Sequence, residues 1–111
     1  MSVEGHIELA KNKGCESRNP LEAHAAFFEE WLVRARAALG DPDTESLTII
    51  LGPAPSEHDA WRRAVAGDLA RAYAPKRFNI AAGAKGEALD QVLRYLRGAP
   101  GVTGHYVQAH D

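Results

Sequence analysis

The sequence has one cysteine, no long apolar run and no excess of positive charge. Because Cys15 is the only thiol among 111 residues, no disulfide can form within the chain, which suits a reducing compartment. No apolar run approaches the roughly 20 residues that span a bilayer, and the N-terminus lacks the charged and then apolar layout of a signal peptide. The formal net charge of -2 provides no basic surface for nucleic acid. We therefore expect a cytoplasmic protein with neither a membrane nor a nucleic-acid partner.

The histidines, the cysteine and the serines form no pattern typical of a metal site or a catalytic centre. The histidines are scattered along the chain, at His6, His24, His58, His105 and His110. Cys15 lies in a polar stretch, where a loop thiol is favoured over a nucleophile. Ser56, His58 and Asp59 are neighbours in sequence, which is typical of a helix start rather than a catalytic triad. We expect no metal.

Residues 19–39 predict the first helix. Asn19 is a good N-cap, Pro20 suits the first helical position, and Gly40 can end the helix in a left-handed conformation. The apolar residues form an arc that is wider than one contact with a sheet requires. They are Leu21, Ala25, Phe28, Leu32, Ala35 and Leu39 on one face, with Phe27, Trp31 and Ala38 on the adjoining flank. This helix is therefore either deeply buried or paired with a second helix, including one from another subunit.

Apolar strands alternate with the remaining predicted helices. Residues 46–51 form a nearly continuous apolar run, as in a parallel strand covered on both faces. A helix from Ser56 must end before Pro75, and a strand at 77–81, a helix at 87–97 and a strand at 104–109 follow. Within the N-terminal segment 1–18, residues 7–10 are a possible edge strand. The alternation predicts a single α/β domain over residues 19–111, with a parallel sheet of three to four strands and about three helices.

The second helix carries polar residues for which two interpretations stay open. Arg62, Arg63 and Arg71 are either an anion-binding patch or, as we favour, a solvated helix face. Asp68 is either a buried functional acid or a carboxylate that reaches solvent, and the second is favoured. Small residues are dense on this helix, which allows another helix or the sheet to approach closely.

Residues 69–83 resemble the carboxyl-terminal half of the short-chain dehydrogenase/reductase family. They read Leu-Ala-Arg-Ala-Tyr-Ala-Pro-Lys-Arg-Phe-Asn-Ile-Ala-Ala-Gly, where the family has a helix ending in Leu-Ala-x-x-x-Ala and a strand of Arg-Val-Asn-x-Ile-x-Pro-Gly type. Thr103-Gly104 and the residues up to Asp111 resemble its final strand. The resemblance covers residues 47–111 and, more loosely, the helix from Asn19. It implies a three-layer, Rossmann-like half-domain whose first two helices pair with the same helices of a second subunit.

The chain departs from this family at the positions that carry chemistry. The family's amino-terminal half is absent, and with it the glycine-rich turn that approaches a dinucleotide pyrophosphate. Tyr-x-x-x-Lys is missing, because Tyr73 is followed four residues later by Arg77, with Pro75 between them. The strand-end Pro-Gly of the family is Ala82-Gly83 here. No catalytic residue and no cofactor-binding residue carries over, so we expect no cofactor.

The sequence thus favours a non-catalytic, homodimeric interaction or regulatory module. The alternative is an oxidoreductase-related enzyme or small-ligand binder in the crevice at the strand ends, in one version completed by a heteromeric dehydrogenase-like partner. A third interpretation is a diverged remnant that dimerises with a full-length relative. The candidate crevice residues are Gly52, Pro53, Ser56, Asn79, Ala82 and Gly83. The candidate interface residues are Phe27, Trp31, Ala64 and Gly67.

Overall fold

Four parallel strands form a single sheet in the order β1-β2-β3-β4 in the computed structural model, which describes residues 5–10 and 18–109. The strands are β1 (His6–Ala10), β2 (Ser46–Leu51), β3 (Arg77–Ala82) and β4 (Tyr106–Gln108). Each neighbouring pair is parallel. The predicted α/β fold is confirmed, and the possible edge strand of the N-terminal segment is β1.

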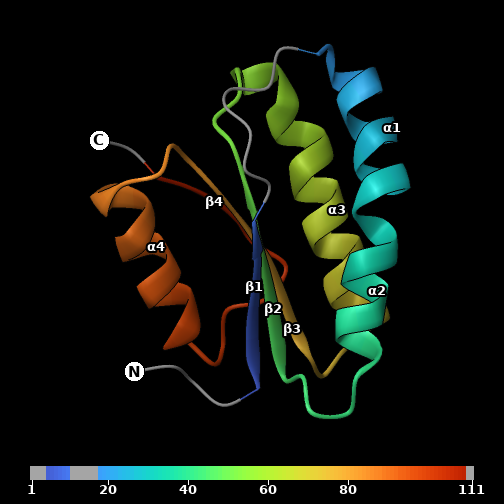
Figure 1. The fold of residues 1–111 in the computed structure, drawn as a ribbon, viewed down its shortest axis with the longest axis vertical. Coiled ribbons are helices and arrows are strands. Elements are labelled where there is room, and N and C mark those ends of the chain that lie inside the picture. The colour runs from blue at the N-terminus through green and yellow to red at the C-terminus, as the bar shows by residue number, and fades with distance from the viewer. Residues whose placement is uncertain (1–4, 11–17, 110–111) are drawn as a thin grey trace.

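Helices cover both faces of the sheet, which gives the predicted three layers (Figure 1). α1 (Pro20–Glu30), α2 (Leu32–Gly40) and α3 (Asp59–Ala72) lie on one face, and α4 (Glu87–Arg97) lies on the other. A short 3-10 helix, η1 (Ser56–His58), leads into α3. Within the described ranges, no helix has the length and apolar character needed to cross a bilayer.

The predicted helix of residues 19–39 is split into two helices at Trp31. Its start is as expected, because Asn19 Oδ1 accepts the N–H of Glu22 at 2.9 Å. The chain turns at Trp31, whose φ and ψ are -112° and -29°. In a straight helix, each step of four residues rotates a side chain by about 40° around the axis. The turn at Trp31 offsets this rotation, so four residues at this spacing all face the core: Phe27, Trp31, Ala35 and Leu39.

The end of α2 differs from the prediction. Gly40 is the last helical residue rather than a left-handed cap, and Asp41 follows in an extended conformation. A lysine from the α3–β3 connection binds the exposed carbonyls instead. Lys76 Nζ donates to the carbonyl oxygens of Leu39 (2.5 Å) and Asp41 (2.7 Å). A cation at this position also interacts favourably with the negative end of the helix dipole.

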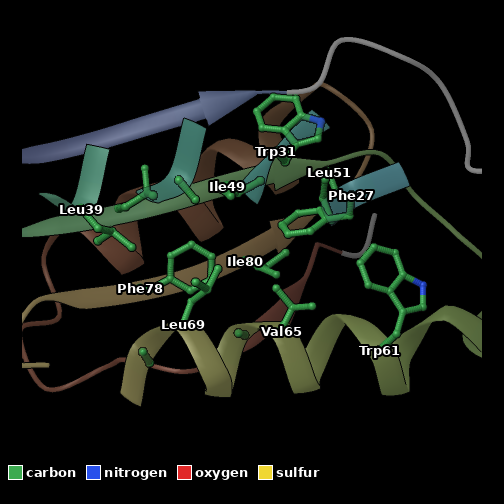
Figure 2. Packing of buried hydrophobic residues seen from close by; sticks show 14 of the residues in the cluster. Phe27, Trp31, Leu39, Ile49, Leu51, Trp61, Val65, Leu69, Phe78 and Ile80 are labelled. Carbon is green, nitrogen blue, oxygen red and sulfur yellow. The ribbon is translucent and has the colours of Figure 1, made fainter. Parts of the chain in front are cut away.

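The core lies between the helices α1–α3 and strands β2 and β3 (Figure 2). Strand residues Ile49, Phe78 and Ile80 are fully buried there. The flank of α1 that carries Phe27 faces this core. Of the predicted principal face, the part on α1 points outward, whereas Ala35 and Leu39 on α2 are buried. Leu21 is 82% exposed and Phe28 is 45% exposed. The apolar arc was therefore recognised correctly, but the sequence pattern did not indicate which part of it meets the sheet.

The small residues of α3 have a packing role within the chain. Gly104 has a φ of 77°, which glycine adopts without strain, and it ends the connection into β4. A Cβ on Gly104 would lie 3.4 Å from the Ala70 methyl group and 3.8 Å from the Cα of Gly67. A side chain at residue 104 would therefore crowd α3, and glycine there lets the β4 connection lie close to the helix.

The neighbouring Phe27 and Phe28 allow a matched test of the core. Phe27→Ala should lower the free energy of unfolding by about 3–5 kcal/mol, because it removes a ring that is 2% exposed. Phe28→Ala should cost about 1 kcal/mol or less, since its ring is already partly in water. Urea unfolding at low protein concentration measures both. Equal losses for the two variants would contradict the placement of α1.

Candidate functional site

The strands β2, β3 and β4 end side by side, and five of the six predicted crevice residues lie at this edge. Leu51 of β2 is in register with Ala82 of β3, which is in register with Gln108 of β4. Gly52, Pro53, Ser56 and Gly83 follow directly or within a short loop. In open α/β sheets, ligands bind at this edge of the sheet.

Asn79, the sixth predicted crevice residue, lies away from the crevice. It is in register with Thr48 in the middle of the sheet, and it is buried. Its Nδ2 donates to the carbonyl oxygen of Val102, and its Oδ1 accepts the N–H of His105, both at 3.0 Å. Asn79 therefore holds the connection into β4 in place, and the hydrogen bonds of its amide serve that connection rather than the strand ends.

Strand β4 narrows the predicted crevice. The N–H of Ala109 donates to the carbonyl oxygen of Ala82 at 2.7 Å, which brings the end of β4 against β3. A Cβ on Gly83 would lie only 2.8 Å from the Cβ of Ala109, so this approach requires glycine. The N-cap residues of η1 and α3 are Pro55 and His58, and neither makes a side-chain capping hydrogen bond, so Ser56 does not cap this helix as expected.

A buried arginine occupies the space beside these strand ends. Arg62 belongs to the first turns of α3 and is 2% exposed. Its Nη1 donates to the carbonyl oxygen of Gly52 (3.0 Å) and to Tyr106 Oη (3.2 Å). Its guanidinium carbon lies 5.5 Å from the Trp61 ring centre and 5.8 Å from that of Tyr106. Sequence reasoning placed this arginine on a solvated face, which is wrong.

The other charged residues predicted on α3, Arg63, Asp68 and Arg71, are exposed to solvent, as the sequence pattern favoured. Arg63 is exposed, and Arg71 forms an exposed ion pair with Asp68, so the three arginines of this helix make no common patch. Exposed pairs of this kind stabilise a fold little. Asp68 is the solvent-reaching carboxylate that the pattern favoured.

A histidine–tryptophan cluster adjoins Arg62. His58 is completely buried, and its Nδ1 accepts a hydrogen bond from Trp61 Nε1 at 3.0 Å. His24 of α1 stacks on the other side, with ring centres 5.1 Å apart and planes at 17° to Trp61. The sequence pattern favours His24 as a packed histidine with a hydrogen bond; the ring is packed, but no described residue bonds its Nε2. Its Nε2 and that of His58 are buried without a hydrogen-bond partner among the described residues.

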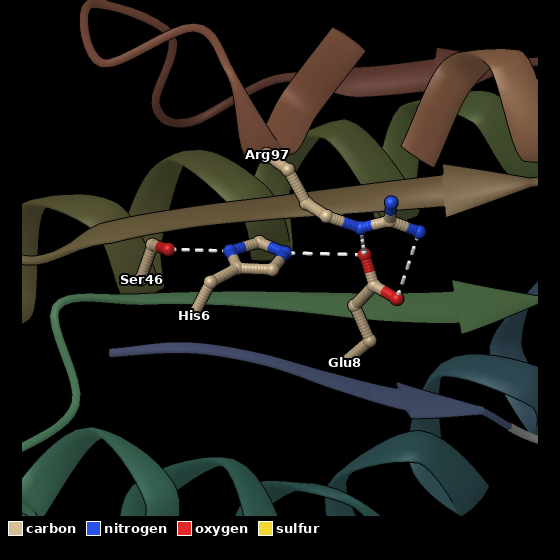
Figure 3. Close-up of polar contacts among 4 residues, drawn as sticks. All are labelled: His6, Glu8, Ser46 and Arg97. Atoms are coloured by element: carbon tan, nitrogen blue, oxygen red, sulfur yellow. Dashed lines mark hydrogen bonds and ion pairs between the residues drawn. The ribbon is translucent and has the colours of Figure 1, made fainter. Parts of the chain in front are cut away.

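A second polar cluster lies on the sheet face that α4 covers (Figure 3). Ser46 Oγ and His6 Nδ1 are 2.5 Å apart, and His6 Nε2 and Glu8 Oε2 are 3.2 Å apart. Because the carboxylate can only accept, Nε2 carries the hydrogen and Ser46 donates to Nδ1. Arg97 at the end of α4 donates to Glu8 at 2.8 Å, and this hydrogen bond raises the pKa of Arg97. The chain of contacts ties α4 to β1.

This Ser–His–Glu order has the composition of a catalytic triad but not its accessibility. Ser46 is the first residue of β2 and is 2% exposed, so a substrate cannot reach its hydroxyl. The strand also starts here, at the edge opposite to the one where α/β proteins bind ligands. The cluster is therefore structural. Across the described part of the chain, no group of three or more His, Cys, Asp or Glu residues could hold a metal, and Cys15 lies outside that part.

Of the four predicted interface residues, two are buried in the core and two are exposed or half-buried on α3. Phe27 and Trp31 are buried in the core of their own chain, so they offer almost no further area to a partner. Ala64 is exposed on the outer side of α3, and Gly67 is half-buried beside Gly104. The homodimer itself stays a prediction.

Comparison with known families identifies the chain. A family model described as SDR-like, short chain dehydrogenase-like protein, matches residues 15–109. The chain therefore belongs to this short-chain dehydrogenase-like family, as its strand and helix motifs indicated. No curated protein and no solved structure matched the chain.

Tyr73 and Arg77, which have the spacing of Tyr-x-x-x-Lys with arginine in place of lysine, cannot act as a dyad. Tyr73 caps the end of α3, whereas Arg77 begins β3 and donates to the carbonyl oxygen of Ala99 at 2.8 Å. One helical turn would be needed to hold a cation against the phenol. Tyr95 is exposed on α4, away from the strand ends.

The helix starts also do not fit the pyrophosphate of NAD(P). The first turn of α1 is already capped by Asn19. The first turn of α4 carries Glu87 and Asp90, which repel a phosphate. α3 is reached through a loop in which Pro53 and Pro55 lack N–H groups.

The chain should accordingly bind NADH and NADPH weakly or not at all, and should catalyse no dehydrogenase reaction. Titration calorimetry against both nucleotides measures the binding directly. A dissociation constant in the micromolar range would contradict this expectation.

The His6 cluster predicts a pH dependence of stability. Burial lowers the pKa of His6 below its ordinary 6.5, although its hydrogen bond to Glu8 acts in the opposite direction. Well above pH 6.5 the ring is neutral in both the folded and the unfolded chain, so it causes no pH dependence there. As the pH falls below 6.5, the unfolded chain takes up the proton first, and the folded state loses stability.

His6→Gln should reduce this loss, because glutamine retains hydrogen-bonding groups but does not titrate. Urea unfolding at several pH values between neutral and mildly acidic measures the slope for both proteins. His105→Gln, at an exposed histidine, is the matched control. If wild type and H6Q lose stability equally as the pH falls, the assignment is wrong.

Proposed function

We propose that this short-chain-dehydrogenase-like domain is a non-catalytic module that acts as a homodimer, with an interaction or regulatory role. The absence of a usable dyad argues against an oxidoreductase, and the residues at the helix starts argue against a dinucleotide. The proposal includes a cytoplasmic location, which a chain with one cysteine suits.

An exposed apolar stripe on α1 and α2 carries this proposal. Its residues are spaced as one helical face: Leu21, Ala25, Phe28 and Leu32. Leu21 and Phe28 are largely or substantially exposed, whereas Leu32 is half-buried. An exposed leucine is ordinary, but a continuous stripe over three helical turns is typical of a helix that meets another helix.

The neighbouring helix supports a two-fold arrangement. α3 lies beside α1 on the same face of the sheet (Figure 1). Ala60 and Ala64 of α3 are exposed. Small side chains allow a partner helix to approach closely. In a two-fold dimer, the stripe of each chain would pack on the small residues of the other, so both surfaces would be buried at once.

Phe28→Asp should convert the dimer into a monomer. The substitution places a charge in the stripe, where burial on association would be unfavourable, while the partly exposed position lets the single chain fold. Light scattering across a dilution series measures the mass, which should fall from twice 12.0 kDa to 12.0 kDa.

Tyr95→Asp is the matched control, because it exchanges an exposed aromatic residue on the opposite layer. It should leave the dimer intact. A wild-type chain that stays monomeric at high micromolar concentration would rule out the homodimer, and equal effects of the two variants would rule out the stripe as its interface.

A small-ligand binder is the second candidate function. The observation that favours it is the buried Arg62, whose charge meets no carboxylate within the described part of the chain, beside the strand ends. Buried charges are normally paired, so a group from outside the chain could complete this site.

A further inference from the structure

The hydrogen bonds around Arg62 leave its charge without a counter-ion. Its two acceptors are a carbonyl oxygen and a phenol oxygen, both neutral. Asp59, the acid nearest to it in sequence, accepts instead from Gln108 Nε2 at 2.6 Å. The rings of Trp61 and Tyr106 offset part of the desolvation through cation–π contacts. Asp59 reaches Arg62 only through Gln108 and Tyr106. A buried cation without a direct ion pair is unfavourable, and an anion would reduce that penalty.

Two buried N–H donors in this cluster have no acceptor. Arg62 Nε is one of them, within the described residues. The second is His58 Nε2: since Trp61 Nε1 can only donate, His58 Nδ1 accepts, and the ring hydrogen is on Nε2. Unsatisfied buried donors are unfavourable, so their presence in one cluster calls for an explanation.

The residues that carry these two donors lie about one helical turn apart at the start of α3. His58 directly precedes the helix with helical backbone angles, and Arg62 follows four residues later. Residues at this spacing are neighbours, with Cβ atoms about 5–6 Å apart. Tyr106 Oη receives hydrogen bonds from both Arg62 and Gln108, so its own hydrogen is available to a third group. The cluster therefore offers three donors.

We propose that His58, Arg62 and Tyr106 form a binding site for a small oxyanion, a carboxylate or phosphate group, beneath the loop of residues 52–56. An oxyanion has several lone pairs, accepts without donating and supplies the missing negative charge. A water molecule fits less well, because it would bring two hydrogens of its own to a site with surplus donors. This inference rests on the second candidate function and names the ligand class for it.

NMR titration of the whole chain with inorganic phosphate and with succinate tests the proposal. Both should shift the amide signals of Gly52, Arg62 and Tyr106 in a saturable manner at constant ionic strength. Arg62→Met should remove these shifts, because it deletes the charge and the donors while keeping an unbranched apolar chain. Arg63→Met deletes an exposed charge one position away and should leave the shifts unchanged.

Succinamide, the neutral counterpart of succinate, distinguishes a failure of the oxyanion site from a failure of the ligand-binding function. If succinamide shifts these signals and the anions do not, the chain is a ligand binder but the oxyanion assignment is wrong. If none of the compounds shifts them, both the oxyanion site and the ligand-binding function are overturned. Equal losses in R62M and R63M would also overturn the site, since they would indicate a general charge effect.

The wild-type chain provides a measurement that does not depend on the folding of a variant. Phosphate and succinate should raise its melting temperature with increasing concentration, because a ligand that binds only the folded state stabilises it. Succinamide and sodium chloride at matched ionic strength should not. A rise that sodium chloride reproduces would mean that the site binds no specific oxyanion.

Discussion

The contact between the helical layer α1–α3 and strands β2 and β3 is the interaction on which the other features depend. Phe78, Ile49 and Ile80 are fully buried in it, and both edge strands are attached through these two central strands. Burial of apolar area at about 25 cal/mol per Å² makes such a layer the main source of stability. Because α1 turns its Phe27 flank to the sheet, its second apolar flank remains on the surface. Because α3 starts at the strand ends, Arg62 is carried into the interior.

The two faces of the sheet are held by different forces. The face toward α1–α3 is almost entirely apolar. The other face carries His6, Glu8 and Ser46 on its first two strands, and α4 packs mainly on β3 and β4. Arg97 bridges the remaining distance through Glu8. On that face, hydrogen bonds therefore attach α4 to the first strands of the sheet. The small domain has too little apolar area to cover both sides of its sheet.

The architecture could be predicted because its signals are local. Asn19 before Pro20, Pro75 after a helical pattern, and the apolar runs of β2 and β3 each indicate an element within a few residues. The alternation of strands and helices indicates a parallel sheet, although it does not fix the order of the strands. The orientation of α1 could not be predicted, since two adjoining flanks are apolar and only the tertiary contact selects Phe27 over Phe28.

The candidate site was less accessible to sequence reasoning for the same physical reason. Arg62 belongs to a helix rich in arginine, and the sequence contains nothing that distinguishes it from the exposed Arg63. Its burial depends on Tyr106, which comes from the last strand. Asn79 was placed at the strand ends from its motif, although its amide serves the connection into β4. Long-range partners decide the role of a polar residue, whereas short motifs only locate it.

The close approach of Gly83 and Ala109 also limits how this chain can evolve. A side chain at residue 83 would collide with the methyl group of residue 109 at 2.8 Å. A substitution at residue 83 becomes acceptable only after residue 109 has lost its methyl group or β4 has shifted. The two positions are therefore epistatic, and the order in which mutations at them arise matters. This dependence couples residue 83, directly after β3, to residue 109, directly after β4.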